Sequence, residues 1–341
     1  MNTSRPSYAT HGLSDRVLVN DWHVVAIADA VQPGQVLPVR LLGVDLVVWR
    51  GGETGVLAWS DRCPHRSIRL SSGRVEGNTL VCPYHGLAYN EQGRCVNVPA
   101  HPDYVPPPQA CIPTYRVQER YGLIFVCLGE PEHDIPAFWE WDDPNHLKFL
   151  SGPHYCRCGG FRAIENFLDL AHLPFIHAGI LGSPNKAVMP DYQVLVDENG
   201  IQMADIQIWQ SDPVGVGHGT IAHYHYWVFR PLTAYLQKET PDGQRLTIWY
   251  AVTPVSEEEF IGWMWVAVNF GDASQIDEMR SFQDKIVRQD LMNLEQHNPK
   301  QLPLHPQAEF HLPCDRGSLA YRKWLKALGV TYGVIESEVR Y

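Results

Sequence analysis

Two short cysteine–histidine motifs constrain this chain more than any other feature. The first is Cys63-Pro64-His65 and the second is Cys82-Pro83-Tyr84-His85, with sixteen residues between them. Each motif offers one thiolate and one imidazole from a tight turn, and its proline restricts the backbone of that turn. A centre for a thiolate- and imidazole-binding metal is therefore the first feature that the fold has to accommodate.

Two kinds of metal centre use two cysteines and two histidines. Structural zinc sites usually pair like ligands, as C-x₂₋₄-C and H-x₃₋₅-H. Here cysteine and histidine alternate within each motif. This alternation is typical of a Rieske-type [2Fe–2S] cluster, in which two cysteines bind one iron and two histidines bind the other. We predict such a cluster, and no zinc site, on Cys63, His65, Cys82 and His85.

Composition limits the class of protein and its partners. A chain of 341 residues with 45% hydrophobic and 19% charged residues is long enough for two globular domains. Its net charge of -11 disfavours nucleic acid or an anionic membrane as the main partner. The polar start has no secretory pattern and no run of about 20 apolar residues follows, so a cytoplasmic location is expected. The six cysteines outside the two motifs are predicted to be buried, without disulfides.

The pattern of elements changes near residue 135. Short apolar runs over residues 17–127 predict a small all-β domain, and a Pro-rich, acidic stretch at 129–144 indicates a boundary. We expect a tail at 1–16, a Rieske domain at 17–135 and a second domain at 136–341. The second domain is predicted to be α+β, with an antiparallel sheet flanked by helices. Its strands are expected at 192–196, 201–209, 221–230, 233–239, 245–253 and 260–270, and its helices at 162–173 and 277–296.

A second group of metal-binding side chains lies in the first predicted helix. Asn166, Asp169 and His172 step by three residues and would share one side of that helix. Pro174 cannot continue a regular helix, so His177 can turn back toward His172. Two histidines and a carboxylate bind mononuclear Fe(II) in oxygenases and leave positions open. An isolated pair of histidines would more often be packed in a core, but a Rieske cluster in the same chain favours an iron site.

The third ligand has to come from another segment, and the carboxylates Asp277, Asp284, Asp290 and Glu295 are the candidates. At about 100° per residue, the apolar residues of the helix at 277–296 cover a single arc. Asp290 falls near the middle of this arc, whereas Asp284 and Glu295 fall outside it. A carboxylate at the centre of a buried face needs a partner, and a metal ion supplies one. We therefore choose Asp290.

These motifs resemble those of the Rieske non-haem iron oxygenases. The similar segments are Asp61-Arg62-Cys63-Pro64-His65-Arg66, Cys82-Pro83-Tyr84-His85-Gly86 and residues 166–177. The resemblance implies a second domain of helix-grip type that binds iron through His172, His177 and Asp290. It also implies a homotrimer in which Asp169, as a catalytic bridging carboxylate, meets His85 of a neighbouring subunit. Alternatively, Asp169 only orients a histidine ligand. Segments near both ends look closest to the cyanobacterial hydroxylases of the saxitoxin pathway.

The resemblance also implies a reaction. The chain would use O₂ and externally supplied electrons to hydroxylate or oxidatively demethylate a small organic substrate. A monooxygenase is favoured over a cis-dihydroxylating enzyme. The sequence has no glycine-rich dinucleotide loop and no plant-type C-x₄-C-x₂-C motif, so electrons are expected from a separate reductase or ferredoxin. The alternatives are a Rieske electron-transfer protein without oxygenase chemistry and a zinc-stabilised binding protein.

The substrate is not determined by the sequence, and the pocket is predicted only in outline. Side chains on the predicted strands are candidates to line it, but strand alternation places about half of them inside. His223 and His225 share a face and are expected to pack among aromatic residues, without a second metal. The candidates are Trp209, His223, His225, Trp227, Tyr250 and Met264.

Overall fold

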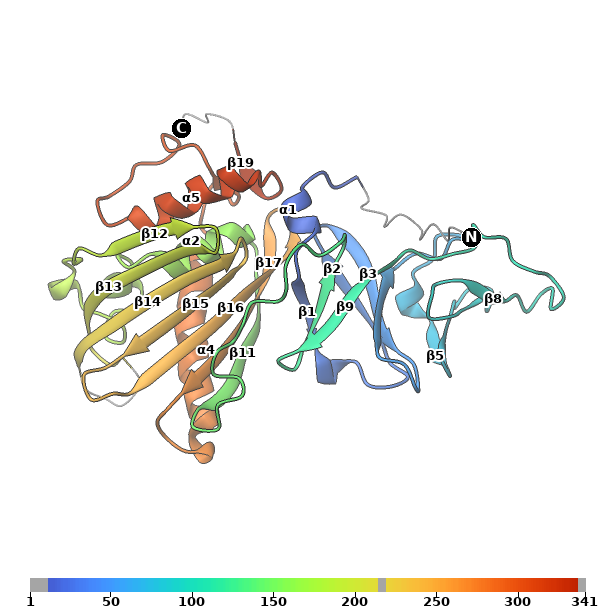
Figure 1. Cartoon of the computed structure of the whole chain (residues 1–341), viewed down its shortest axis with the longest axis horizontal. Helices are drawn as coiled ribbons and strands as arrows, with labels where there is room; N and C mark the ends of the chain where they lie inside the picture. The colour runs from blue at the N-terminus through green and yellow to red at the C-terminus, as the bar shows by residue number, and fades with distance from the viewer. Residues whose placement is uncertain (1–11, 214–218, 337–341) are drawn as a thin grey trace. The chain divides into compact units, whose positions relative to one another are not determined.

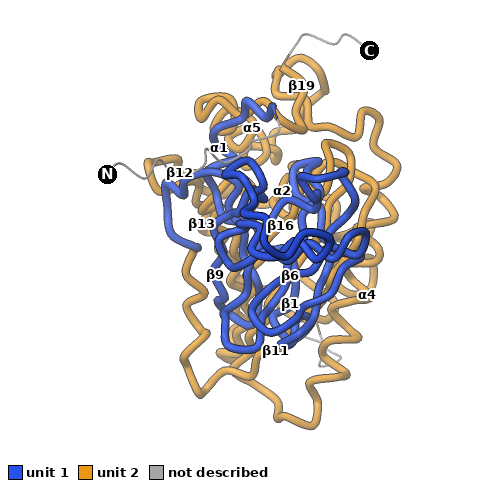
Figure 2. The backbone as a smooth tube through the Cα atoms, turned by 90° about the vertical axis from the view of Figure 1, so that its right-hand side faces the viewer, with its two compact units in different colours: residues 1–135 blue, residues 136–341 orange. Residues whose placement is uncertain are grey.

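The computed structural model describes residues 12–213 and 219–336 of the 341-residue chain. The chain divides into two compact units, Met1–Ile135 (unit 1) and Pro136–Tyr341 (unit 2), which Figure 2 shows in different colours. Of the tail predicted at residues 1–16, residues 1–11 lie outside the described residues. Helix α1, Arg16–Val19, begins at Arg16, the last residue of this predicted tail.

Unit 1 contains two antiparallel sheets, which confirms the predicted all-β domain. The larger sheet has the order β1-β10-β9-β4-β3-β2, and the smaller one has the order β5-β6-β7-β8. The β2–β3 and β9–β10 hairpins turn on Leu42-Gly43 and Tyr121-Gly122, where all four residues have positive φ. Such turns match the right-handed twist of the strands that they join. The strands are β1 His23–Ile27, β2 Val36–Leu41, β3 Val44–Arg50, β4 Val56–Ser60, β5 Arg74–Glu76, β6 Thr79–Val81, β7 Ala88–Tyr89, β8 Cys95–Asn97, β9 Thr114–Arg120 and β10 Leu123–Cys127.

The core of unit 1 reaches directly under the two cysteine–histidine motifs. Trp49 and Trp59 pack edge to face with ring centroids 4.8 Å apart. Cys63, Cys82 and Tyr89 belong to the same buried cluster as these two tryptophans. Because interiors are close-packed, this cluster gives both motifs a rigid base.

Unit 2 is built on a seven-stranded antiparallel sheet with the order β11-β17-β16-β15-β14-β13-β12 (Figure 1), as predicted for an α+β domain. Six of these strands lie where the sequence predicts strands. The first, β11, was not predicted, because residues 147–156 carry Gly, Pro and several polar side chains without clean alternation. The strands are β11 Leu147–Cys156, β12 Gln193–Asp197, β13 Gly200–Gln210, β14 Thr220–Arg230, β15 Thr233–Glu239, β16 Arg245–Ser256 and β17 Glu259–Val268.

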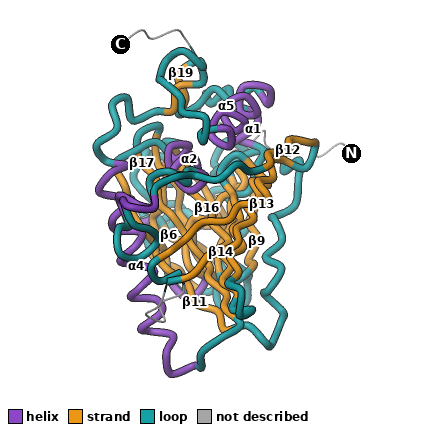
Figure 3. Tube along the Cα trace, turned by 90° about the vertical axis from the view of Figure 1, so that its left-hand side faces the viewer, coloured by secondary structure: helices purple, strands orange, loops and turns teal. Residues whose placement is uncertain are grey.

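Helices flank this sheet, and Figure 3 separates them by colour from the strands. The long helix α4, Ile276–Leu294, follows a capping box formed by Asp272 and Gln275. Helix α5, Arg316–Leu328, ends at Gly329, which adopts the left-handed conformation common after helices. The remaining elements of unit 2 are α2 Gly160–Leu168, α3 Leu173–Ile176 and the short parallel pair β18 Leu302–Pro303 and β19 Val334–Ile335.

The helix predicted at residues 162–173 is wrong in its second half. Helix α2 ends at Leu168, and Asp169 follows it with extended backbone angles. The Asp169 carboxylate accepts a hydrogen bond of 2.8 Å from the Ala171 N–H, and such local bonds compete with helix continuation. Asn166, Asp169 and His172 therefore do not share one continuous helix face.

Among the described residues, no helix has both the length and the apolar character needed to cross a membrane.

Candidate functional site

The two cysteine–histidine motifs adopt nearly the same loop. The Cys63 N–H bonds to the Ile68 carbonyl and the Cys82 N–H bonds to the Leu87 carbonyl, both at 2.9 Å. The residue four positions after each cysteine donates a backbone N–H hydrogen bond to the carbonyl of that cysteine. The donor is Ser67 in one loop and Gly86 in the other. Each of these donor residues has positive φ, 59° at Ser67 and 70° at Gly86. The loops are thus matched halves of one site.

The two cysteines of the motifs differ from the two histidines in solvent exposure. Cys63 and Cys82 are each 1% exposed, whereas His65 and His85 are exposed, with ring centroids 4.7 Å apart. The thiolates therefore face the core and the imidazoles face solvent. A redox partner can approach from solvent and exchange an electron through the imidazoles. The Tyr84 ring lies 3.9 Å from the His85 ring and restricts its orientation.

The arrangement fits two irons better than one zinc ion. Ligand atoms of one tetrahedral ion at about 2.0–2.3 Å lie within about 4 Å of one another. In the part of the chain that the structure describes, only His172, His177 and Asp290 bring three or more such atoms within 4.8 Å. Cys63, His65, Cys82 and His85 are spread more widely, as ligands of separate irons are.

Tyr89 is a hydrogen-bond donor to this site that the sequence analysis missed. Its hydroxyl lies 3.2 Å from Cys63 Sγ. Burial raises the pKa of Tyr89 well above its ordinary value, so the phenol stays protonated and donates. Burial also raises the pKa of the Cys82 thiol, so the positive charge of bound iron is needed to hold its thiolate form.

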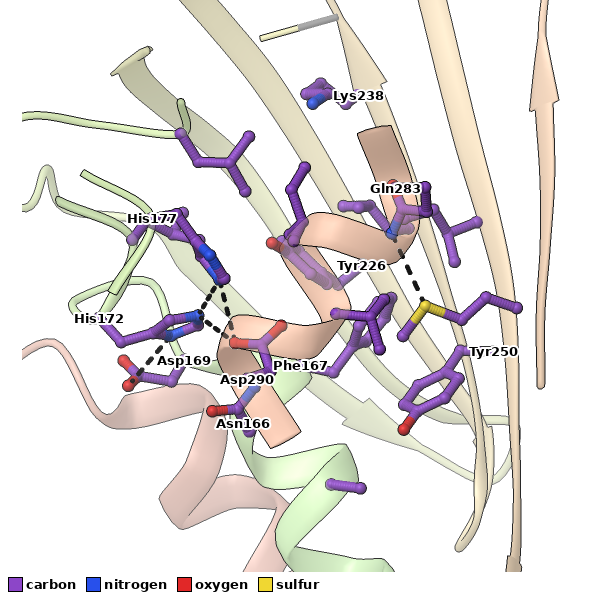
Figure 4. Close-up of a pocket in the computed structure, with 18 of the residues that line it drawn as sticks. Asn166, Phe167, Asp169, His172, His177, Tyr226, Lys238, Tyr250, Gln283 and Asp290 are labelled. Atoms are coloured by element: carbon purple, nitrogen blue, oxygen red, sulfur yellow. Dashed lines mark hydrogen bonds and ion pairs between the residues drawn. The ribbon is translucent and has the colours of Figure 1, made fainter. Parts of the chain in front are cut away.

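In unit 2, the structure brings together His172, His177 and Asp290 (Figure 4). Asp290 Oδ1 lies 3.0 Å from His177 Nε2 and 3.4 Å from His172 Nε2. The two Nε2 atoms are 3.3 Å apart. A metal whose ligands lie at about 2.1 Å and at right angles separates neighbouring ligand atoms by about 3.0 Å. The triangle thus has the size of one face of an octahedral iron site.

The unsatisfied polar atoms also point to a metal. Within the described residues, the buried Asp290 Oδ1 has no hydrogen bond of good geometry, although it lies close to both imidazoles. A buried carboxylate oxygen without a donor is costly. A metal ion between the three side chains would satisfy this oxygen and both Nε2 lone pairs, so the donor set fits mononuclear iron.

The interruption after α2 is what lets the two histidines converge. On a continuous α-helix, residues five apart point about 140° away from each other. Here His172 precedes the single-turn helix α3 and His177 follows it, with Pro174 near its start. Pro174 therefore opens a new turn, whereas the earlier helix has already ended at Leu168.

Neighbouring charges in the pocket shift the pKa values of His172 and Asp290. Burial lowers the pKa of His172, but Asp169 and Asp290 outweigh this effect and raise it to about 9. Burial raises the pKa of Asp290, but the attraction of the nearby His172 and His177 imidazoles outweighs it and holds the pKa at about 2. Without a metal, His172 is thus a cation beside an ionised Asp290; a metal cation would replace its proton.

Two side chains contact the histidines from outside the triangle. Gln289 Oε1 lies 2.9 Å from His177 Nδ1, so it accepts a hydrogen bond from Nδ1–H and leaves the lone pair of Nε2 free. Gln289 was not predicted from the sequence. On the other histidine, Asp169 Oδ2 lies 3.4 Å from His172 Nδ1, which is ion-pair distance without good hydrogen-bond geometry. The Asp169 side chain remains 36% exposed, so another molecule can reach it.

The other predicted carboxylate candidates lie elsewhere. Asp277 pairs with Arg280, Asp284 accepts a 2.5 Å hydrogen bond from Ser151, and Glu295 accepts one from the Arg157 N–H. None of these three carboxylates joins the triangle.

The eight cysteines are all free, as expected. Outside the cluster motifs, only Cys127, Cys156 and Cys158 are fully buried; Cys95, Cys111 and Cys314 are partly exposed, against the prediction of burial. Burial raises the pKa of Cys156 to about 12 and that of Cys158 to about 11, so both remain thiols.

A pocket opens beside the triangle, and the large sheet forms one of its walls. Alternate residues of neighbouring strands line it, as strand geometry requires. Of the candidates from the sequence, Tyr250 and Met264 line the pocket, whereas Trp209, His223, His225 and Trp227 do not, and His225 instead stacks on Trp227. The wall consists of Tyr224, Tyr226, Leu236, Lys238, Leu246, Ile248, Tyr250 and Met264, of which the sequence analysis missed all but the last two.

Both units of the chain match families of known proteins. Residues 21–116 match the Rieske [2Fe-2S] domain, and residues 157–331 match the vanillate O-demethylase oxygenase C-terminal domain. Methylxanthine N1-demethylase NdmA of Pseudomonas putida is 31% identical over 330 residues, 92% of each chain. Methylxanthine N3-demethylase NdmB of the same organism is 29% identical over 91% of this chain and 89% of its own.

Solved structures show the same architecture. NdmA with caffeine superposes with a TM-score of 0.79 at 27% identity, over 95% of this chain and 98% of that one. Dicamba monooxygenase bound to dicamba, at 23% identity and a TM-score of 0.76, shares the fold over 91% of this chain and 97% of its own. With its matched domains, its near-complete relatives and its two metal sites, this chain belongs to the Rieske non-haem iron oxygenases.

Proposed function

We propose that this oxygenase oxidatively removes a methyl group bound to nitrogen or oxygen from a small aromatic substrate. The observation that carries the proposal is the His172–His177–Asp290 triangle at the wall of an aromatic pocket. The overall reaction for an N-methyl substrate is R₂N–CH₃ + O₂ + 2 e⁻ + 2 H⁺ → R₂NH + CH₂O + H₂O. Relatives that are 29–31% identical over most of their length are methylxanthine N-demethylases, which supports demethylation over dihydroxylation.

The residues have distinct roles in this proposal. Cys63, Cys82, His65 and His85 hold the [2Fe–2S] cluster, and His172, His177 and Asp290 hold the iron. When bound, these groups supply single electrons and the activation of O₂.

The protein itself holds the ligands and excludes water. Gln289 fixes the tautomer of His177 by accepting a hydrogen bond from its Nδ1–H. The apolar and aromatic wall, with Tyr226 and Tyr250 buried, keeps water from the substrate methyl group.

Electrons have to come from a partner protein. We propose a separate reductase as the donor, in line with the 41% identity between 114 residues of this chain and oxidoreductase NdmD of Pseudomonas putida. The cluster histidines are exposed, so a donor can approach them from solvent.

We further propose a homotrimer in which Asp169 of one subunit meets His85 of the next. His85 is exposed and the Asp169 carboxylate is 36% exposed, so both can take part in such a contact. The contact would give the electron a short hydrogen-bonded path to the iron. Sedimentation of the purified protein at the mass of a monomer would contradict this arrangement.

The function is tested by turnover with a surrogate reductase. The assay supplies NADH, O₂ and either methylxanthines or methoxy- and N-methylbenzoates, and measures formaldehyde and the demethylated product. Equal amounts of both products support demethylation. A product with an added oxygen and no formaldehyde would indicate hydroxylation, which the predicted kinship with saxitoxin-pathway hydroxylases favours. An iron content of only two per chain would instead indicate an electron carrier without oxygenase chemistry.

A further inference from the structure

A single lysine stands out on the apolar wall of the pocket. Lys238 lies on β15, between Tyr224 of β14 and Leu246 of β16 in the strand register, and all three side chains line the pocket. Lys238 is 5% exposed. Figure 4 shows it apart from the three metal ligands, in the same pocket. It is thus a buried cationic group that faces the space a substrate would occupy.

Among the described residues, the ammonium group of Lys238 donates to a single acceptor. It donates to the Pro213 carbonyl and lies 5.8 Å from the centre of the Tyr224 ring. An ammonium carries three N–H donors, so two of them have no acceptor in the part of the chain that the structure describes. Over residues 12–213 and 219–336, no carboxylate lies within ion-pair distance of Lys238 Nζ, and Asp212 acts on it only at longer range.

Burial of this cation is costly. Burial lowers the pKa of Lys238 to about 7, and the attraction of Asp212 offsets only part of the effect. A buried ammonium without an anion is destabilising, and a leucine or methionine would pack equally well beside Leu236 and Leu246. An anionic oxygen that enters the pocket would remove this penalty and occupy the spare donors.

We propose that Lys238 is a substrate-positioning residue that binds the carboxylate of a planar aromatic acid. This inference rests on the proposed demethylation, because Lys238 would orient the substrate so that the methyl group of the substrate faces His172, His177 and Asp290. The aromatic ring would lie against Tyr226 and the aliphatic wall. The chain would therefore prefer methylated aromatic acids to their neutral analogues.

Binding without turnover tests this proposal separately from the reaction. Anaerobic calorimetry would compare 4-methoxybenzoate with 4-methoxybenzamide, and 4-(dimethylamino)benzoate with its amide, on the iron-loaded protein. We expect the wild type to bind each acid at least tenfold more tightly than its amide. In Lys238→Met, acid binding should weaken about 10- to 100-fold, the range for a hydrogen bond to a charged group, while amide binding changes little. Lys238→Arg should retain part of the preference.

The ratio of acid to amide affinity separates positioning from structure. If Lys238 only anchors the chain at Pro213, Lys238→Met would weaken both ligands equally. Lys186→Met is the matched control, since Lys186 is an exposed cation over the Trp209 ring and does not line the pocket. Wild-type protein that binds no acid, or binds acid and amide equally, overturns the proposal, even if the substitutions prevent folding. Acid-selective binding without formaldehyde would leave the assignment of Lys238 intact and contradict the proposed function.

Discussion

Replacement of Gln289 by leucine should weaken iron binding without removing any ligand. Gln289 Oε1 accepts a 2.9 Å hydrogen bond from Nδ1 of His177, a side chain that is 1% exposed. With leucine, an iron-bound His177 would keep a buried Nδ1–H without an acceptor, at a cost of about 1–3 kcal/mol. This cost corresponds to roughly a 5- to 150-fold loss in affinity, and mutations of such supporting partners typically cost about 10- to 100-fold.

The metal-free protein avoids most of this cost. His177 can move its proton to Nε2, where the ionised Asp290 carboxylate, with Oδ1 3.0 Å away, stabilises the N–H. Iron occupies the Nε2 lone pair and prevents this exchange of tautomers. The penalty of Gln289→Leu should therefore appear in iron affinity, with a much smaller change in the melting temperature of the iron-free protein.

Anaerobic titration with Fe(II), in competition with a chelator, measures the effect. The visible spectrum of the cluster in unit 1 reports that the protein remains intact. Gln283→Leu is the control, because Gln283 lies on the same helix and its amide contacts Met264 and no ligand. Wild-type iron affinity in Gln289→Leu, or equal losses in both variants, would refute the assigned role of Gln289.

Three further changes test other parts of the molecule. Tyr89→Phe removes the donor to Cys63 Sγ, so the more negative reduced cluster loses stabilisation. Its reduction potential should fall by roughly 40–60 mV in protein-film voltammetry, or about 1–1.4 kcal/mol, and an unchanged potential would exclude the hydrogen bond. Asp169→Asn keeps the acceptor for Ala171 N–H, and should keep both metals by elemental analysis yet lose turnover; normal turnover would refute the electron relay. Two buried arginines pair with Glu309 and lower its pKa to about 2, so Glu309→Gln should cost about 1–3 kcal/mol in urea unfolding near pH 7. Because this depressed pKa stabilises the fold only above it, the difference from wild type should vanish as the pH falls from about 4.5 toward 2; a constant difference would contradict this origin.

Local patterns made both metal sites visible in the sequence. The cluster motifs each span a few residues, and His172 and His177 lie five apart. The short spacing within each group is therefore enough to recognise these ligands in the sequence. Asp290 was found because helical periodicity placed a charge on a buried face, and the structure puts it beside both histidines. For Asp290, the signal was a charged residue at a position where helical periodicity predicts burial.

Other parts of the site depend on long-range contacts that no local pattern encodes. Gln289 meets His177 across 112 residues of sequence, and an exposed glutamine would give the same helical pattern. Lys238 was read only as part of a strand, although a lysine within a buried strand was a usable signal. The early end of α2 came from one hydrogen bond of Asp169, which competed with a helix that periodicity favoured.

The interruption between α2 and α3 also limits how this segment can vary. The four residues of α3, Leu173–Ile176, form one turn whose length sets where His177 returns. Deleting or inserting a single residue there would rotate His177 by about 100° and carry its imidazole away from Asp290. The sixteen residues between the two cluster motifs include a two-stranded hairpin, β5–β6, whose tip could change length without moving either loop. Length variation is therefore tolerable in the electron-donating unit and prohibited beside the iron.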